Sequence, residues 1–220
     1  MNKLLTTVFA FAVASVTVVS AHAEAIKGDA KAGANKVAMC IGCHGIQGYQ
    51  ASFPEVYKVP KISSQSSAYI VSALTAYKKG ERKHPSMKAI AASLTEQDMA
   101  DLGAFYSTQA GPATAESAPA PTPPATVAEL LKKGNCASCH GENLNKPIDP
   151  SYPKLAGQHA DYLFVALKAY QTEGNPQVGR GNAIMAGMAK PFSHAELKQM
   201  ASYIASLPTD LKTVPESRFR

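Results

Sequence analysis

The chain contains four cysteines, and all of them lie in two copies of the pattern C-x-x-C-H: Cys40, Cys43, Cys136 and Cys139. Two thiols at positions i and i+3 can form thioethers with both vinyl groups of one haem, and the adjacent histidine is then placed to ligate the iron. Two disulfides, a redox C-x-x-C or a zinc site would not explain why a histidine follows the second cysteine in both copies. The pattern therefore predicts two covalently bound haem c groups.

The two copies belong to a tandem duplication. Residues 68–77, AYIVSALTAY, match residues 161–170, DYLFVALKAY, with Tyr, Ala, Leu, Ala and Tyr identical in register. Between the copies, residues 109–126 hold five of the 15 prolines and almost no large apolar side chain, which is typical of a semi-rigid linker. Two copies are too few for a solenoid, so we expect two similar domains. The expected boundaries are 24–110 for the first domain, 111–126 for the linker and 127–220 for the second domain.

Hydrophobic spacing predicts helices in both copies and no convincing strand. The matched ten-residue segments have helical periodicity. The last helix of each copy is expected to begin at Thr95 or at Ser193, where Ser193-x-x-Glu196 forms a capping box. Another capping box, Thr126-x-x-Glu129, predicts the start of a short helix. Three helices and long loops make a poor core for a small domain. We therefore expect an all-α fold of two tandem domains, each with three or more helices wrapped around its haem.

Two further pairs of residues complete the predicted haem contacts. His44 and His140 directly follow the second cysteine of each pattern and are the expected proximal iron ligands. Arg82 and Arg180 stand at matching places in the two copies, and a guanidinium there could pair with a haem propionate. A solvated loop arginine is the other interpretation of these two residues.

The sixth iron ligand is predicted from the register of the duplication. When Thr95 is aligned on Ser193, Met87 aligns with Met185, and no other methionine of the first copy aligns with a methionine of the second. We therefore expect Met87 and Met185, in the loops before the last helices, to ligate the two irons. Two alternatives stay open: His84 is a rival ligand in the first copy, and both methionines could serve only in packing.

The first 23 residues have the features of a secretory signal peptide. Lys3 is followed by a short apolar run, and small residues stand at Ala21 and Ala23. The pattern predicts cleavage after Ala23 rather than a retained membrane anchor. Removal of the segment lowers the formal net charge from +6 by one, because Lys3 is its only charged residue. Such a mild charge does not favour a nucleic-acid partner. We expect a soluble exported protein with at most peripheral membrane association.

These residues together resemble the cytochrome c4 family. The resemblance rests on the two C-x-x-C-H sites, the Pro-Lys-Ile and Pro-Lys-Leu steps at 60–62 and 153–155, the segment LAGQHADYL at 155–163, and the methionine segments before the last helices. It implies a periplasmic two-haem electron carrier made of two class I cytochrome c domains. It also implies that the carbonyl groups of Pro60 and Pro153 accept the Nδ1 hydrogens of the proximal histidines.

Ligation of each iron by histidine and methionine leaves no vacant position for a substrate. We therefore expect no enzyme activity, but the transfer of single electrons between respiratory complexes, toward a terminal oxidase. The expected partners are redox proteins, with a quinol–cytochrome c reductase as donor and a haem–copper oxidase as acceptor. Two other functions stay open. One is the cytochrome subunit of a dehydrogenase such as a sulfide-oxidising flavocytochrome c. The other is a two-haem peroxidase, which needs an open or exchangeable iron position.

Overall fold

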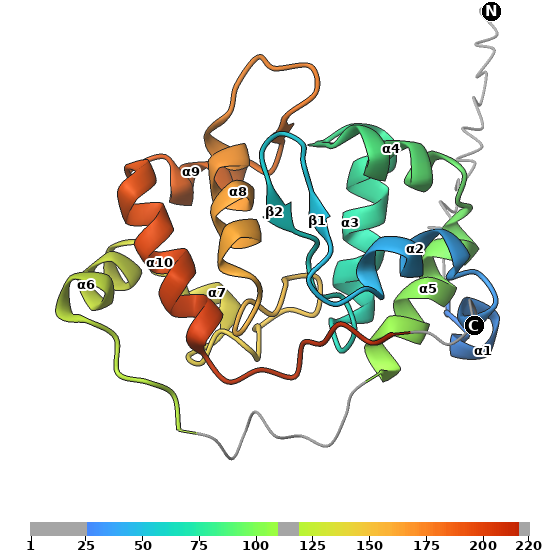
Figure 1. Cartoon of the computed structure of the whole chain (residues 1–220), viewed down its shortest axis with the longest axis horizontal. Coiled ribbons are helices and arrows are strands. Elements are labelled where there is room, and N and C mark those ends of the chain that lie inside the picture. Colours follow the sequence, from blue (N-terminus) through green and yellow to red (C-terminus); the bar gives the residue numbers. More distant parts are fainter. Residues whose placement is uncertain (1–25, 110–118, 216–220) are drawn as a thin grey trace, which may run out of the picture.

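The structure is a computed structural model that describes residues 26–109 and 119–215 (Figure 1). The predicted signal peptide and the first half of the predicted linker, residues 111–118, lie outside the described residues. The helices of the first half are α1 (Ala30–Ala34), α2 (Ala38–His44), α3 (Ser67–Lys79), α4 (Pro85–Ala92) and α5 (Glu96–Thr108). Those of the second half are α6 (Ala125–Lys133), α7 (Ala137–His140), α8 (Ala160–Gln171), α9 (Ala183–Ala189) and α10 (His194–Ser206). The strands are β1 (Gln50–Ala51), β2 (Tyr57–Lys58), β3 (Arg82–Lys83) and β4 (Gly179–Arg180).

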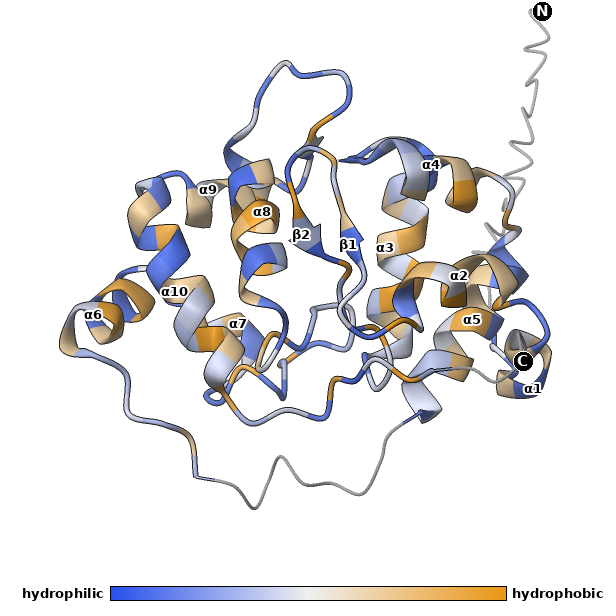
Figure 2. Cartoon of the chain, in the orientation of Figure 1, coloured by the Kyte–Doolittle hydropathy of each residue, from blue (hydrophilic) through white to orange (hydrophobic). Residues whose placement is uncertain are grey.

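Each half is built around a pair of long helices. Helix α5 packs against α3 in the first half, and α10 packs against α8 in the second. Apolar side chains of the two last helices form the cores, because Met99 and Leu102 of α5 and Leu197 and Met200 of α10 are almost fully buried. The connection between α8 and β4 is mostly hydrophilic (Figure 2). Among the described residues, no helix has the length and apolar character needed to span a bilayer.

The starts of the last helices are as predicted. Thr95 and Ser193 are the N-caps of α5 and α10, and each forms a capping box with the residue three positions later. The capping box predicted at Thr126 is wrong. A cap at Thr126 would start the helix at Val127, but α6 begins two residues earlier, at Ala125. Its N-cap is Pro124, whose carbonyl group accepts the first helical hydrogen bond from Ala128 at 2.9 Å. Thr126 therefore lies inside the first turn, where it cannot act as the cap.

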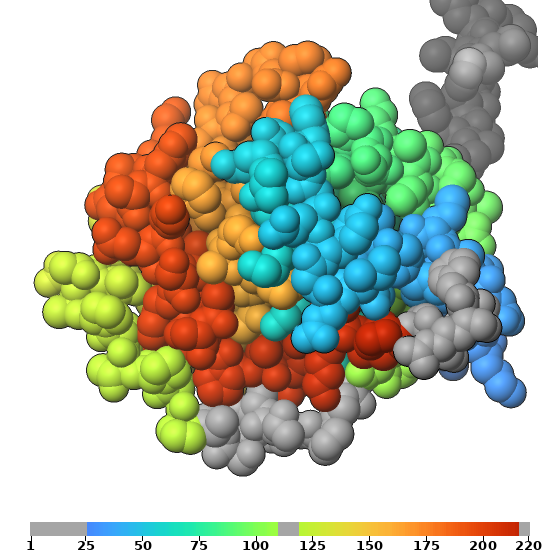
Figure 3. All heavy atoms as spheres, viewed as in Figure 1, coloured from blue at the N-terminus to red at the C-terminus, as the bar shows by residue number. Residues whose placement is uncertain are grey.

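The two halves are joined by backbone pairing. Strand β3 of the first half pairs antiparallel with β4 of the second, so that Arg82 lies opposite Arg180. The segment that follows α10 then crosses back to the first half, where the amide of Lys212 donates to the carbonyl oxygen of Ser63 at 3.1 Å. Figures 1 and 3 show this segment, in red, running from the lower end of α10 along the lower part of the molecule toward α5. Leu211 in this segment is buried.

The crossing of α1 and α5 depends on a residue without a side chain. A Cβ atom at Gly33 would lie 2.1 Å from the carbonyl oxygen of Asp101, which belongs to the α5 backbone. We expect Gly33→Ala to lower the free energy of unfolding by about 1–3 kcal/mol, because the rigid backbone cannot yield as a side chain could. Denaturant unfolding of the two-haem protein measures the change. Lys31→Ala, on the exposed side of α1, is the control and should stay within about 0.5 kcal/mol of the parent. Equal losses in both variants would contradict this account of the crossing.

Candidate haem sites

The two C-x-x-C-H patterns lie on short helices. The first occupies the end of α2, which terminates at His44. The second starts at Cys136, the N-cap residue of α7, and continues through α7 to His140. Residues three and four apart share one face of a helix, so this local structure brings both thiols of a pattern and its histidine to the same side. All four cysteines are free thiols, and each is partly buried. Burial raises the pKa of Cys40 and of Cys136.

Both histidines are held by the carbonyl groups that the resemblance implied. The Nδ1 atom of His44 lies 2.8 Å from the carbonyl oxygen of Pro60, and that of His140 lies 3.0 Å from the carbonyl oxygen of Pro153. A hydrogen on Nδ1 leaves Nε2 as the free lone pair that a metal requires. Burial lowers the pKa of both histidines, although the carbonyl hydrogen bonds oppose it. The two rings are therefore held neutral, oriented and ready to ligate.

The two predicted methionine ligands lie in short helices, not in loops. Met87 is in α4 and Met185 is in α9, each at the third position of its helix. A side chain caps each helix at the methionine: Met87 N–H donates to Nδ1 of His84 at 3.3 Å, and Met185 N–H donates to Oδ1 of Asn182 at 2.9 Å. The expectation of loops was wrong because these caps were not recognised in the sequence. The equivalence of the two methionines is unaffected.

The remaining described methionines lie in other environments. Met99 and Met200 are 2% and 4% exposed and pack between the long helices. Met39 and Met188 are 51% and 46% exposed. Only the predicted pair is partly buried at equivalent places in the two halves.

His84, the rival ligand, makes two hydrogen bonds and caps a helix. Its Nδ1 atom accepts from the Met87 amide, and its Nε2 atom lies 3.0 Å from the hydroxyl group of Tyr57. Both ring nitrogens are therefore engaged. In the register of the duplication His84 corresponds to Asn182, which also caps its helix. The rival ligand is thus a helix cap, and the geometry favours Met87.

The two predicted propionate-binding arginines are brought together at the junction of the halves. Arg82 donates to the hydroxyl oxygen of Tyr69 at 2.8 Å, and Arg180 donates to that of Tyr162 at 3.0 Å. Each guanidinium also lies over two tyrosine rings of the long helix in its own half, at 5.3–5.6 Å from the ring centroids. The arrangement in one half repeats that in the other, so the solvated-loop interpretation does not describe it.

This arginine pair has no carboxylate partner among the described residues. Two like charges directly opposite each other in a strand pair are unfavourable unless an anion lies nearby. The excess positive charge also acts on its neighbours. Burial alone would raise the pKa of Tyr162, but Arg180 and Arg82 outweigh burial and lower it. A haem carries two carboxylates, so the unpaired guanidiniums, the free thiols and the oriented imidazoles fit two haem c groups.

The sequence analysis missed two glutamines that the structure places at the interface. Gln65 and Gln158 are 3% and 4% exposed and make hydrogen bonds to the opposite half. A signal was present in the sequence, since each glutamine stands four residues after the lysine of the matched Pro-Lys step.

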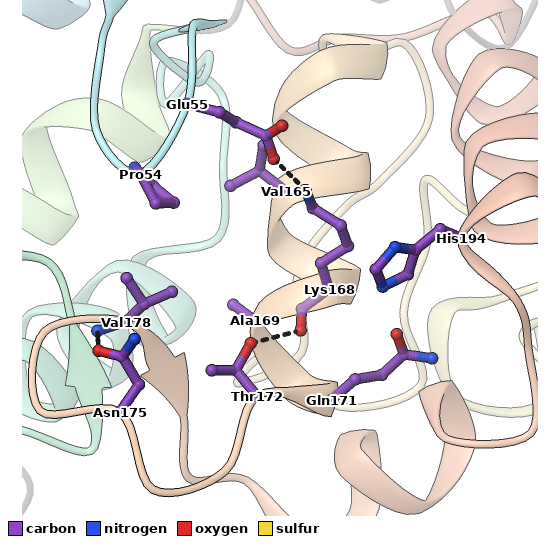
Figure 4. Close-up of a pocket in the computed structure, with 10 residues that line it drawn as sticks. All are labelled: Pro54, Glu55, Val165, Lys168, Ala169, Gln171, Thr172, Asn175, Val178 and His194. Atoms are coloured by element: carbon purple, nitrogen blue, oxygen red, sulfur yellow. Dashed lines mark hydrogen bonds and ion pairs between the residues drawn. The ribbon is translucent and has the colours of Figure 1, made fainter.

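A separate pocket lies beside α8 and includes none of the predicted haem residues (Figure 4). It has a volume of about 380 Å³ and is bordered by Pro54 and Glu55 of the first half. An ion pair between Glu55 and Lys168 crosses it. Glu55 and Lys168 pair with each other, so this pocket supplies no carboxylate for the arginine pair. It also lacks the residues predicted to hold a haem.

The sequence and the fold are similar to those of known proteins. A cytochrome c family model matches residues 30–109 and 125–208. Cytochrome c4 of Stutzerimonas stutzeri is 32% identical and covers 85% of this chain and 91% of the relative. A protein named thiosulfate dehydrogenase electron acceptor, from Stutzerimonas stutzeri (strain A1501), is 28% identical and covers 80% of this chain and 82% of the relative. The solved structure of reduced recombinant cytochrome c4 from Pseudomonas stutzeri has a TM-score of 0.59 and 30% identity, and covers 82% of this chain and 99% of that chain.

Proposed function

The chain belongs to the cytochrome c4 family, with two tandem cytochrome c domains and two haem c groups, and we propose that it carries single electrons between respiratory complexes in the periplasm. One observation carries the proposal. Each half presents one oriented neutral histidine and one capped, partly buried methionine at equivalent positions. His44 with Met87, and His140 with Met185, would hold the two irons and would leave no position for a substrate.

The proposed residues have three roles: covalent attachment of the haem, ligation of the iron and pairing with the haem propionates. Cys40 and Cys43 would hold one haem and Cys136 and Cys139 the other, through thioether bonds. Bound there, haem c supplies a one-electron iron(III)/iron(II) couple. The Pro60 and Pro153 carbonyl groups fix the histidine rings, so the ligands need little rearrangement when the charge changes.

The arginine pair would balance the charge at the junction. Arg82 and Arg180 are each fixed by a hydroxyl group and by aromatic rings, and their guanidiniums would donate charge-assisted hydrogen bonds to haem propionates. Because the two arginines lie opposite each other, propionates bound to them would lie at the same junction. We keep the proposed domain boundaries at 24–110 and 127–220, with residues 111–126 as the linker.

We propose a periplasmic location because of the signal-peptide pattern in residues 1–23. A quinol–cytochrome c reductase is the proposed donor and a haem–copper oxidase the proposed acceptor. One observation favours a second candidate. A relative that covers most of the chain is named thiosulfate dehydrogenase electron acceptor, so a sulfur-compound dehydrogenase is an alternative donor. Rapid mixing of the oxidised protein with each reduced candidate donor distinguishes the two, since only the physiological donor should reduce it in a fast, saturable reaction.

The absence of catalysis is tested by ligand binding. With both axial positions filled, the reduced protein should bind carbon monoxide poorly, and its peroxide turnover should not exceed that of other six-coordinate haems. Carbon monoxide difference spectra measure the first property. Met185→Ala, which would open one iron, is the positive control and should bind carbon monoxide at about half of the haem. Rapid, saturable peroxidase activity of the unmodified protein would instead favour the two-haem peroxidase.

A further inference from the structure

The interface contains two glutamines related by the duplication. Gln158, in the second half, accepts from the Lys61 amide and donates to the Lys61 carbonyl oxygen, both at 2.9 Å. Gln65, in the first half, accepts from the Lys154 amide at 3.0 Å and donates to the Lys154 carbonyl oxygen at 3.1 Å. Each glutamine therefore makes two hydrogen bonds to one backbone residue of the other half, and the two arrangements are equivalent.

Neither glutamine is free to turn. The Oε1 atom of Gln65 also accepts from the amide of Ser66, and that of Gln158 accepts from the amide of His159. Two N–H donors at the oxygen and a carbonyl acceptor at the nitrogen fix the orientation of each side-chain amide. Both side chains are almost fully buried, so these hydrogen bonds do not compete with water.

The bonded lysine amides belong to the peptide groups that hold the histidines. The N–H of Lys61 and the carbonyl group of Pro60 are two ends of one peptide group, and that carbonyl oxygen accepts from His44 at 2.8 Å. In the other half, the N–H of Lys154 shares a peptide group with the carbonyl group of Pro153 that accepts from His140. Each proximal histidine is thus two hydrogen bonds and one peptide group away from a glutamine of the opposite half.

We propose that Gln158 and Gln65 are crossed positioning residues, each of which tunes the proximal histidine of the other half through a single peptide group. The inference rests on the proposed ligation by His44 and His140. Hydrogen bonds in a chain polarise one another, so an acceptor on the lysine N–H increases the negative charge on the proline carbonyl oxygen. A stronger acceptor at Nδ1–H makes the imidazole more basic. A more basic imidazole favours the oxidised state of the iron that it ligates and lowers its midpoint potential.

This series of hydrogen bonds gives the direction of the expected change in midpoint potential. Gln158→Met keeps the length of the side chain but removes its acceptor, so it should shift the midpoint potential of the first haem upward. The second haem, although it belongs to the same half as the mutated residue, should shift several-fold less. Gln65→Met should produce the opposite pattern, with the larger upward shift at the second haem. Gln158→Asn and Gln65→Asn, whose amides are too short to reach, should repeat these directions.

The measurement is a redox titration followed by NMR, with the paramagnetically shifted signals of the two haems assigned separately. Exchange of the histidine Nδ1 hydrogen in the same samples gives a second readout, and it should be faster in the half opposite the mutated glutamine. Ser66→Ala is the matched control, because it also removes a neutral hydrogen bond between the halves, to the carbonyl oxygen of Pro150, but touches neither histidine peptide. It should leave both potentials close to those of the parent.

The outcomes separate this inference from the proposed function. A crossed pattern in the two single variants supports it. Equal shifts at both haems, or a larger shift within the mutated half, would overturn it and assign the glutamines to docking alone. If the NMR spectrum of the parent protein lacked the signals of two histidine-ligated haems, the proposed function itself would fail. That result would be seen in the parent protein, before any glutamine is replaced.

Discussion

Replacing both Cys136 and Cys139 with alanine is expected to lower the covalent haem content of the exported protein from two groups to one. Thioether bonds need a thiol at each position, and the structure shows all four thiols free and partly buried. The first half should keep its haem, because its cysteines lie on a separate helix. The intact mass after acid denaturation measures the loss directly, and the haem absorbance per chain should fall by about half.

In the matched control, Cys40 and Cys43 are replaced with alanine instead. This variant should lose the haem of the first half and keep that of the second half. Ser138→Ala, between the second pair of cysteines, should leave both haems attached. An intact mass equal to that of the bare processed chain, in the unmodified protein, would contradict the two-haem assignment altogether.

Met185→Ala is expected to remove about half of the weak near-infrared absorption that arises from methionine sulfur bound to oxidised haem iron. The reason is that Met185 is the partly buried methionine of the second half at the place equivalent to Met87. Loss of a methionine ligand should also lower the midpoint potential of that haem alone, because methionine ligation raises it. Near-infrared absorption and a redox titration are the two measurements.

Met188 in the second half and His84 in the first half give the controls. Met188→Ala removes an exposed methionine from the same helix and should leave the absorption unchanged. In the first half, Met87→Ala should abolish the remaining absorption when it is combined with Met185→Ala. His84→Ala removes a helix cap, so it should cost stability while the absorption survives. A larger spectral change from His84→Ala than from Met87→Ala would assign the ligand to the histidine.

Much of this site could be predicted because its information is local. The spacing of cysteine and histidine depends on a few consecutive residues, and the duplication aligns Met87 with Met185 without any knowledge of the fold. The start of α10 was predicted for the same reason, since its capping box, Ser193-x-x-Glu196, lies within four residues. The same rule failed at Thr126 because Pro124 fixes an earlier entry into the helix.

The interface could not be predicted, because it depends on contacts between residues far apart in the sequence. Gln158 and Lys61 are 97 positions apart, and the matched spacing of each glutamine from its own Pro-Lys step does not indicate that the two residues meet. The arginines illustrate the same limit. Their matching positions indicated a shared role, but only the pairing of β3 with β4 shows that they lie opposite each other and share tyrosine-lined surroundings.

The segment after α10 has a consequence for the order in which the protein matures. It is synthesised after both C-x-x-C-H patterns, yet its Lys212 amide completes the contact with Ser63 of the first half. The contact with Ser63 can therefore form only after residues 207–215 have been synthesised, so the last part of the interface to form comes from a segment that follows both C-x-x-C-H patterns. The β3–β4 pair and the hydrogen bonds of Gln65 and Gln158 involve only residues that precede this segment. The halves can thus begin to dock through these contacts, and the segment after α10 then completes the interface.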